Sequence, residues 1–228
     1  KSIYYIYSEK EKRQMQKIKV LNLYAGIGGN RKLWDNVEVT AVELNDSISK
    51  IYSSFFPQDK VIVGDAHQYL LEHYKEFDFI WSSPPCPTHS RARFWGFGGN
   101  GKIPVFPDMT LYEEIIFLQY HFKNKYIIEN VIPYYEPLVN PTLILHRHTI
   151  WSNFKISAME FETLETCRKH GEREFLAEKL GFNLDNFSGI DKRKVLRNCV
   201  IPEIGLHIFN SAFNKKEASQ DLLFKIAV

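Results

Sequence analysis

The chain has 228 residues, of which 44% are hydrophobic, and its formal net charge is only +2. This length allows one domain with a sizeable core plus a small appendage, and the low charge excludes a strong overall electrostatic field. The apolar runs fall far short of the roughly 18 residues that a membrane span needs, and the charged start at residues 1–19 has no signal-peptide core. We therefore expect a soluble intracellular protein.

Apolar runs alternate with helix-like segments along the first two thirds of the chain. Strands are predicted at 19–24, 38–43, 60–63, 77–82, 125–128 and 147–154, and helices at 30–35, 46–54, 66–74 and 109–122. Such alternation is typical of an α/β fold with a doubly wound, mostly parallel sheet covered on both faces. The alternation is lost at 155–194, so we predict a main domain at 1–154, a small lobe at 155–194 and a returning C-terminal segment at 195–228.

The first predicted strand runs into a glycine-rich turn, Tyr24-Ala25-Gly26-Ile27-Gly28-Gly29. Glycines let backbone N–H groups approach a ligand closely. The next two strands end in Glu43 and Asp65, which could hold ribose hydroxyls and an adenine amino group. Either acid on its own is explained more simply as a helix N-cap. Because ligands bind at the carboxyl ends of parallel strands, we expect Tyr24, Glu43, Asp65 and Cys86 to share one crevice.

A cysteine and a glutamate follow two later strands. Cys86 lies in Ser83-Pro84-Pro85-Cys86-Pro87, directly after the run 77–81, and Glu129-Asn130-Val131 follows the run 126–128. A single cysteine at a strand end is more often inert packing than a nucleophile. Here, however, the thiol lies in a loop and a carboxyl group follows a second strand, and both come after the glycine-rich turn and the two strand-end acids. This combination indicates a nucleophile and an acid.

These motifs, in this order, closely resemble the DNA cytosine-5 methyltransferase family. The similarity runs from Val20 to Phe213 and ends in Arg197-Asn198-Cys199-Val200-Ile201-Pro202, with Arg197 where glycine is usual. The resemblance implies a Rossmann-like fold that uses S-adenosyl-L-methionine and yields S-adenosyl-L-homocysteine. It also implies a catalytic domain at 1–154 and target recognition by the lobe 155–194. The compact size is similar to enzymes of bacteriophages and other mobile elements, where modification protects phage DNA or accompanies a restriction nuclease.

The resemblance implies a covalent mechanism for the enzyme. The thiol of Cys86 would add to C6 of cytosine, which makes C5 nucleophilic enough to take the methyl group. Glu129, with a raised pKa, would donate to or protonate N3, and Arg147 would assist. The C5 proton and the sulfur then leave, and the reaction requires no metal. Because a base inside a duplex cannot reach such a pocket, the nucleotide must be flipped out.

The resemblance also implies two sets of binding residues. The cofactor contacts expected are Tyr24, Ala25, Gly26, Gly28, Glu43, Leu44, Asp65, Ala66, Pro85, Leu111, Asn198 and Val200. Contacts with double-stranded DNA are expected from Ser90, Arg91, Arg93, Trp95, Lys192 and Arg193. Four of these lie in the segment 87–107, whose glycines allow movement, whose aromatic side chains can stack, and which has no acidic residue to repel a polyanion. The same segment could instead be packed structure.

Two departures from the family pattern stand out. The family's Gln-x-Arg-x-Arg strand is represented by residues 145–151, and alignment on Phe154 puts His146 and His148 at the arginine positions, with Arg147 between them. Two histidines without a third ligand nearby indicate polar surface or DNA contacts rather than a zinc site, so we expect no metal. Fewer than fifty residues separate Trp151 from Arg197, which favours a short or relaxed recognition sequence.

Two alternatives remain. A related family applies the same thiol chemistry to cytosine in transfer RNA. A catalytically silent module that binds DNA or senses S-adenosylmethionine is conceivable because of the altered arginine strand, but intact Cys86 and Glu129 argue against it. The three cysteines show no Cys-x-x-Cys spacing and their odd number argues against a disulfide framework. We expect a monomer in the cytoplasm of a bacterial or phage-infected cell.

Overall fold

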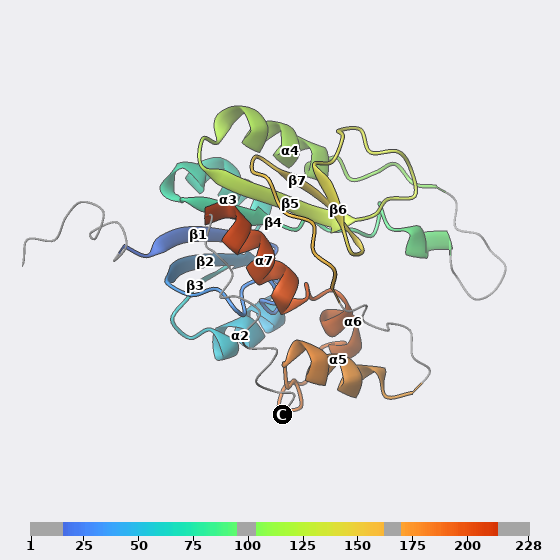
Figure 1. Cartoon of the computed structure of the whole chain (residues 1–228). Helices are drawn as coiled ribbons and strands as arrows, with labels where there is room; N and C mark the ends of the chain where they lie inside the picture. The colour runs from blue at the N-terminus through green and yellow to red at the C-terminus, as the bar shows by residue number, and fades with distance from the viewer. Residues whose placement is uncertain (1–15, 95–103, 162–169, 214–228) are drawn as a thin grey trace, which may run out of the picture.

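The computed structural model describes residues 16–94, 104–161 and 170–213 (Figure 1). Within these residues, seven strands form one sheet in the order β3-β2-β1-β4-β5-β7-β6. The strands are β1 (Ile18–Leu23), β2 (Val37–Glu43), β3 (Lys60–Val63), β4 (Phe79–Ser82), β5 (Lys125–Val131), β6 (Leu143–Leu145) and β7 (His148–Ser152). Strands β1 to β5 pair in parallel, whereas β7 is antiparallel to both β5 and β6. The predicted doubly wound, mostly parallel α/β fold is confirmed.

Both faces of the sheet are buried, which explains why its central strands are apolar throughout. Side chains of a strand point alternately to opposite faces. Val20 of β1 therefore lies in the cluster that includes α2 (Asp46–Phe55) and α7 (Pro202–Phe213). Leu21 lies in the cluster of α3 (Ala66–His73) and α4 (Thr110–His121). Figure 1 shows α4 and α2 on opposite sides of the sheet, and the helices predicted at 46–54, 66–74 and 109–122 are confirmed.

One local prediction is wrong, one strand has shifted ends and one strand was not predicted. The segment 30–35 forms successive turns rather than a helix: Arg31 N donates to Gly28 O, and the Arg31 side chain binds Trp34 O at 2.8 Å, which occupies a carbonyl that a helix would use. The last strand begins at His148 because residues 146 and 147 form the turn of the β6–β7 hairpin, with His146 at φ 55°. The three-residue strand β6 was not predicted, because it is too short to show periodicity.

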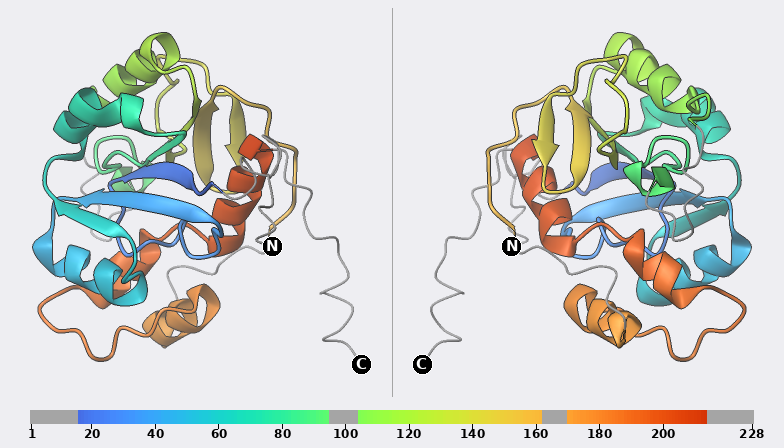
Figure 2. Two further views of the ribbon diagram at one scale, coloured as in Figure 1. Left: turned by 90° about the vertical axis from the view of Figure 1, so that its left-hand side faces the viewer. Right: turned by 90° about the vertical axis from the view of Figure 1, so that its right-hand side faces the viewer.

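The C-terminal third contains α5 (Glu172–Leu180), α6 (Lys192–Arg197) and α7. Helix α7 returns to the sheet, where Phe209 stacks on Trp34 with ring centroids 5.2 Å apart. Both views of Figure 2 show α5 below the sheet and α7 against it. Phe182, which follows α5, packs edge-on against Phe55 of α2 at 4.9 Å. The apolar side chains of this region thereby join the same core cluster as the sheet.

Two features are absent from the described ranges of the chain. No helix in them is both long and apolar enough to cross a membrane. Nor do three or more His, Cys, Asp or Glu side chains there come together in a group that could hold a metal ion. Of two short 3₁₀ helices, η1 (Tyr74–Glu76) directly follows α3, and η2 (Arg91–Phe94) lies in the loop after β4.

Substitution of Gly205 would show how tightly α7 packs against Asn30, the residue after the first glycine turn. A Cβ at Gly205 would lie 2.3 Å from Asn30 O and 2.7 Å from Asn30 Cα, which are both backbone atoms. Alanine normally stabilises a helix relative to glycine. Here we expect Gly205→Ala to lower the free energy of unfolding by about 1–3 kcal/mol, because the added methyl overpacks the contact. Urea denaturation measures it. Gly64→Ala, where the nearest atom is 3.9 Å away, is the control, and equal losses in both variants would contradict this packing.

Candidate active site

The loops that follow the parallel strands meet at one edge of the sheet, and Glu43 joins two of them. Its Oε2 accepts from Gly26 N at 3.0 Å and its Oε1 from Asn45 N at 2.9 Å. Asn45, not Glu43, caps helix α2. Asp65 does cap α3, because its Oδ1 accepts from Gln68 N at 3.0 Å. The helix-cap explanation therefore holds for Asp65 and fails for Glu43, whose carboxylate is held across the turn.

The glycines of the first turn differ in the space around their backbone. Tyr24, Gly26 and Gly28 all have positive φ, at 54°, 55° and 85°. A Cβ at Gly28 would lie 2.4 Å from the Phe56 ring, and one at Gly29 would lie 2.2 Å from Cys199 Sγ. A Cβ at Gly26 would meet nothing within 4 Å. Gly28 and Gly29 are thus needed for packing, whereas Gly26 presents its backbone to open space.

Tyr24 is fixed by a buried carboxylate that the sequence analysis missed. The Tyr24 hydroxyl donates to Glu114 Oε1 at 2.7 Å, and Ser82 Oγ donates to Glu114 Oε2 at 2.5 Å. His67 Nδ1 lies 3.2 Å from the same Oε1. Burial, and then the neighbouring Glu114, raise the pKa of Tyr24 far above its usual value. Nothing in the sequence marks Glu114, because an acid on a helix is normally a solvated one.

The other predicted cofactor contacts are divided between surface and core. Leu44 has 74% of its surface exposed although it is apolar, and Pro85 and Asn198 are also exposed. Ala25, Ala66, Leu111 and Val200 are buried. The carbonyl of Val200 would lie 2.3 Å from a Cβ at Gly29. The closing motif, residues 197–202, therefore packs directly on the glycine turn.

The structure brings the predicted nucleophile and acid together. Asn130 Nδ2 donates to Pro84 O at 2.9 Å, which ties the Pro-Cys loop to β5. Burial raises the pKa of the Cys86 thiol, the Glu129 carboxylate raises it further, and Arg147 and Lys194 oppose both effects. The thiol therefore lies within electrostatic range of one carboxylate and two cations, of which Lys194 comes from α6. Lys194 was not among the predicted site residues.

Glu129 is 7% exposed, and its environment corrects the expected protonation state. Its Oε1 forms a hydrogen bond with Nδ1 of His148. Burial raises the pKa of Glu129, but His148, the Ser83 hydroxyl and Arg147 together outweigh it, so the pKa lies below its ordinary value. The prediction of a raised pKa is wrong, because it counted burial and missed the partners. Glu129 is a carboxylate in the free site.

Arg147 lies in the hairpin turn rather than on a strand. Its Nε lies 3.4 Å from Nε2 of His148, and its Nη2 donates to Arg197 O at 2.9 Å. His146 and His148 were expected to share a face of one strand. The positive φ of His146 places it in the turn, although the two rings still stack with centroids 6.4 Å apart.

The residues predicted to touch DNA are held mainly by backbone groups of their own or neighbouring loops. Arg91 Nε donates to Pro133 O at 3.0 Å, and Arg93 Nη1 donates to Pro87 O at 3.2 Å. Ser90 forms an isolated β-bridge with Pro133. Lys192 Nζ donates to Asp185 O at 3.1 Å, and Arg193 is exposed. Trp95, with the rest of 95–103, lies outside the described residues.

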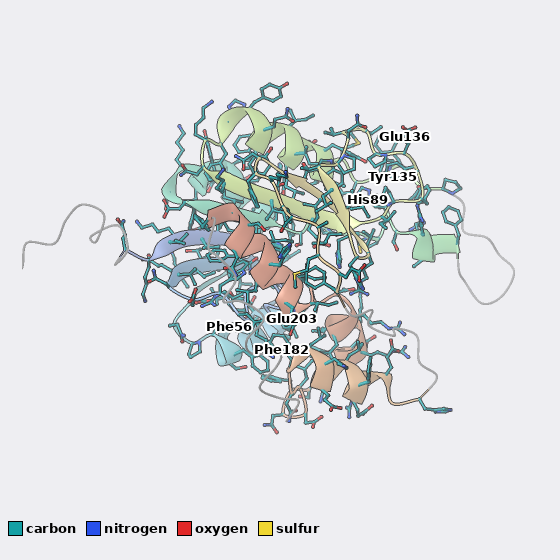
Figure 3. All side chains as sticks on the ribbon, in the orientation of Figure 1. Phe56, His89, Tyr135, Glu136, Phe182 and Glu203 are labelled. Carbon is teal, nitrogen blue, oxygen red and sulfur yellow. The ribbon has the colours of Figure 1, made fainter. Side chains whose placement is uncertain are left out.

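His89 is a second residue that the sequence analysis missed. It follows Cys86 in the same loop, is 1% exposed, and its Nδ1 lies 2.5 Å from the Tyr135 hydroxyl (Figure 3). The backbone N–H of His89 donates to Cys86 O at 3.0 Å, and Tyr134 N donates to His89 O at 3.1 Å. Burial lowers the pKa of His89. The His89 ring thus connects the loop of Cys86 to Tyr135, in the segment after β5.

The raised pKa of Cys86 predicts slow alkylation at neutral pH. The rate with iodoacetamide should increase through a midpoint above the ordinary thiol value of 9.0, because only the thiolate reacts. Peptide mapping by mass spectrometry at each pH measures it. Cys199, which is 5% exposed and whose pKa burial raises to about 12, should stay unmodified. Glu129→Gln should lower the Cys86 midpoint. A wild-type midpoint below that of a free thiol would contradict this environment.

Comparisons with known proteins show which proteins this chain resembles. The profile of the family described as C-5 cytosine-specific DNA methylase matches residues 18–132. The tRNA (cytosine(38)-C(5))-methyltransferase of Spodoptera frugiperda is 32% identical over 80 residues, which are 32% of this chain and 24% of that protein. The human protein of that name is 30% identical over 84 residues, which are 34% of this chain and 22% of that protein. The matched part thus spans less than a quarter of each curated relative.

Solved structures with sequence similarity include a mutant of Spodoptera frugiperda DNMT2, 25% identical, with a TM-score of 0.37 over 50% of this chain and 36% of that one. The Entamoeba histolytica methyltransferase EhMeth is 20% identical, with a TM-score of 0.34 over 51% and 38% of the two chains. The family profile covers 115 of the 228 residues, from 18 to 132. The chain therefore belongs to the C-5 cytosine-specific DNA methylase family, whose methyl donor is S-adenosylmethionine.

Proposed function

We propose that the protein transfers a methyl group from S-adenosylmethionine to C5 of cytosine in DNA, through a covalent bond between Cys86 and C6. The observation that carries the proposal is that the loop of Cys86 is tied to β5, the strand of Glu129, by the hydrogen bond from Asn130 Nδ2 to Pro84 O at 2.9 Å, with Glu129 near enough to raise the pKa of the thiol. A thiol and a carboxylate from neighbouring strands are the two groups that addition to a pyrimidine requires.

The residues at the ends of β1, β2 and β3 fit the methyl donor. Gly26 faces open space, the Glu43 carboxylate is fixed beside it, and Leu44 presents an exposed apolar side chain to an adenine-sized group. Asp65 follows the next strand. Glu43 would hold the ribose hydroxyls and Asp65 the adenine amino group. The bound cofactor supplies an electrophilic methyl group.

The directions of the two pKa shifts suggest how the proton moves. Cys86 holds its proton and Glu129 is ionised in the free site. As the sulfur bonds to C6, an electron pair moves onto N3 of the base and the thiol proton is released. Glu129 accepts this proton and passes it to N3. Thiol plus carboxylate and thiolate plus carboxylic acid hold the same number of protons, so this pair makes the rate insensitive to pH between the two pKa values.

Access to the base requires flipping of the nucleotide from the duplex. We propose that the loop 87–107, of which 95–103 lie outside the described residues, closes on the flipped base, since Arg91 is exposed in the loop that follows Cys86 and could neutralise a phosphate. We assign sequence preference to the lobe 155–194, which packs on α2 through Phe182. The protein would act as a monomer, as part of restriction-modification or in protecting phage DNA.

A specific observation favours transfer RNA as a second candidate substrate. Both curated relatives carry the name tRNA (cytosine(38)-C(5))-methyltransferase. Cys86 and Glu129 could treat a cytosine in either nucleic acid in the same way, so the contacts outside the reactive pair decide between them. Transfer of a radioactive methyl group to unmethylated duplex DNA and to tRNA, measured side by side, separates the two.

Cys86→Ser should abolish methyl transfer while leaving the fold intact, because the replacement is nearly isosteric but far less nucleophilic. The wild-type protein should form a covalent adduct with duplex DNA that contains 5-fluorocytosine, since fluorine at C5 cannot leave as a proton does. Gel electrophoresis under denaturing conditions detects the adduct. Turnover by the serine variant would refute the assignment of Cys86, and an adduct with fluorinated tRNA alone would refute DNA as the substrate.

Glu43→Ala should weaken binding of S-adenosyl-L-homocysteine at least about tenfold, because it removes a charged hydrogen-bond acceptor worth roughly 1.5–3 kcal/mol. Isothermal calorimetry measures the affinity. Glu38→Ala is the matched control, since Glu38 is an exposed acid on the same strand away from the carboxyl edge. Unchanged affinity in Glu43→Ala, or an equal loss in both variants, would place the cofactor elsewhere.

A further inference from the structure

A buried carboxylate joins the carboxyl ends of β1 and β4. The strand order β3-β2-β1-β4-β5 changes direction at this pair, and ligands of such sheets bind at the change of direction. Leu23 of β1 pairs with Ser82 of β4, and Glu114 reaches both strand ends from α4. One oxygen of Glu114 accepts from the Tyr24 hydroxyl at 2.7 Å, and the other accepts from the Ser82 hydroxyl at 2.5 Å.

Glu114 is unfavourable to bury at this place. It is 0% exposed, and the other buried side chains of α4 are Leu111, Tyr112, Ile115 and Leu118. A charge in apolar surroundings destabilises the fold unless it is paired, and an apolar side chain of similar volume would avoid that cost. Packing therefore gives no reason for a carboxyl group here, and its role lies in the groups that it binds.

One of these groups, Tyr24, has a strained backbone. Its φ is 54°, a left-handed conformation that side chains other than asparagine and aspartate rarely adopt. Such strain persists only where the surrounding structure fixes it. The glycine turn, residues 24–29, begins with Tyr24: Ala25 N donates to Val42 O at 3.0 Å, and Gly26 N donates to Glu43 at 3.0 Å. The conformation of Tyr24 thus determines the direction in which the turn leaves β1.

The Tyr24 hydroxyl is the part of the residue that Glu114 holds. Burial, and then Glu114, keep the pKa of Tyr24 far above its usual value, so the hydroxyl remains a donor at neutral pH. His67 of α3 contacts the same carboxylate, with its Nδ1 3.2 Å from Oε1, and this hydrogen bond raises the pKa of His67. Because α3 begins directly after Asp65, Glu114 connects the ends of β1 and β4 with the start of α3.

The geometry also shows that Glu114 acts through its partners. It has no exposed surface, and both of its oxygens already accept from side chains. Tyr24, in contrast, is half-buried and lies two residues before Gly26, which presents its backbone to open space. An effect of Glu114 on a ligand in that space therefore passes through Tyr24.

We propose that Glu114 is a positioning residue for the methyl donor: by anchoring the Tyr24 hydroxyl, it holds the glycine turn in its cofactor-binding conformation before S-adenosylmethionine binds. This proposal rests on the proposed function, in which the donor lies across Gly26, Glu43 and Asp65. A turn that is already ordered loses less conformational freedom on binding, so the affinity for the donor rises without a new contact. The anchor affects donor binding and leaves the methyl-transfer step unchanged.

Calorimetry with S-adenosyl-L-homocysteine tests the anchor. Tyr24→Phe keeps the ring and removes the hydroxyl, so the affinity should fall about three- to tenfold, the effect of one net hydrogen bond. Glu114→Gln should bind like the wild type, because its amide oxygen still accepts from Tyr24 and the Ser82 hydroxyl can accept from the amide nitrogen. Glu114→Met fills the same space without an acceptor and should behave like Tyr24→Phe. The two changes combined should cost no more than either one.

Glu113→Gln is the matched control. Glu113 precedes Glu114 on α4, its side chain is 61% exposed, and its Oε2 lies 3.7 Å from Nε2 of His67. It makes no contact with Tyr24 that would anchor the turn, so the affinity in Glu113→Gln should stay at the wild-type value. Wild-type affinity in Tyr24→Phe, or an equal loss in Glu113→Gln, would overturn the proposal, whether or not Glu114→Met folds.

Hydrogen exchange measured by mass spectrometry separates an ordered turn from a general gain in stability. In Tyr24→Phe without ligand, peptides that cover residues 24–30 should exchange faster than in the wild type, and peptides that cover β7 should not. S-adenosyl-L-homocysteine should remove the difference. Equally faster exchange throughout the chain would indicate a structural role alone and would overturn the proposal. In methylation of duplex DNA by Tyr24→Phe, KM for S-adenosylmethionine should rise while kcat changes little.

Glu43→Ala separates failure of this proposal from failure of the proposed function. If Glu43→Ala and Tyr24→Phe both bind S-adenosyl-L-homocysteine like the wild type, the donor lies elsewhere and the placement behind both proposals is wrong. If only Glu43→Ala weakens binding, the role of Glu114 alone is wrong. If binding changes as expected in both variants but no nucleic acid is methylated, the anchor stands and the proposed reaction of Cys86 fails.

Discussion

The antiparallel pairing of β7 with β5 decides how the reactive edge is built. Strands β1 to β5 are parallel, so the loops that follow them lie at one edge of the sheet. A further parallel strand would also have its last residue at this edge, and its first residue at the opposite one. Because β7 runs in the opposite direction, its first residue, His148, lies opposite Val131 at the end of β5. The hairpin turn with Arg147 therefore reaches the same edge as Cys86 and Glu129.

Glu129 shifts the protonation of Cys86, whereas other partners determine the protonation of Glu129. Glu129 raises the pKa of Cys86, after burial has already done so, while His148, Ser83 and Arg147 hold Glu129 ionised against its own burial. Burial strengthens these interactions, because the effective dielectric constant is lower than in water. With its proton on the sulfur, Cys86 is less reactive toward reagents in the solvent than a thiolate would be.

The closing motif serves both halves of the site. Val200 and Cys199 pack on Gly29, where a side chain could not fit, and so support the turn that carries Gly26. Two residues before Cys199 in this motif, Arg197 stands where the family pattern has glycine. Its carbonyl holds Arg147 and its guanidinium pairs with Glu172 of α5. The side chain at this position thus links α6 to α5, which glycine could not do, whereas the contact with the β6–β7 hairpin uses a backbone carbonyl that glycine would also offer.

The sequence by itself determined the parallel core of the fold and the candidate residues at its edge. Apolar runs of strand length end in Tyr24, Glu43, Asp65 and Cys86, and local periodicity is enough to predict that such runs pair and share an edge. Only the tertiary structure decided the ionisation of Glu129 and the place of Arg147. Both depend on contacts between β5 and β7, with Glu129 and His148 separated by 19 residues, and on a two-residue turn. Register between distant strands is set by packing and turn geometry, which local pattern does not reveal.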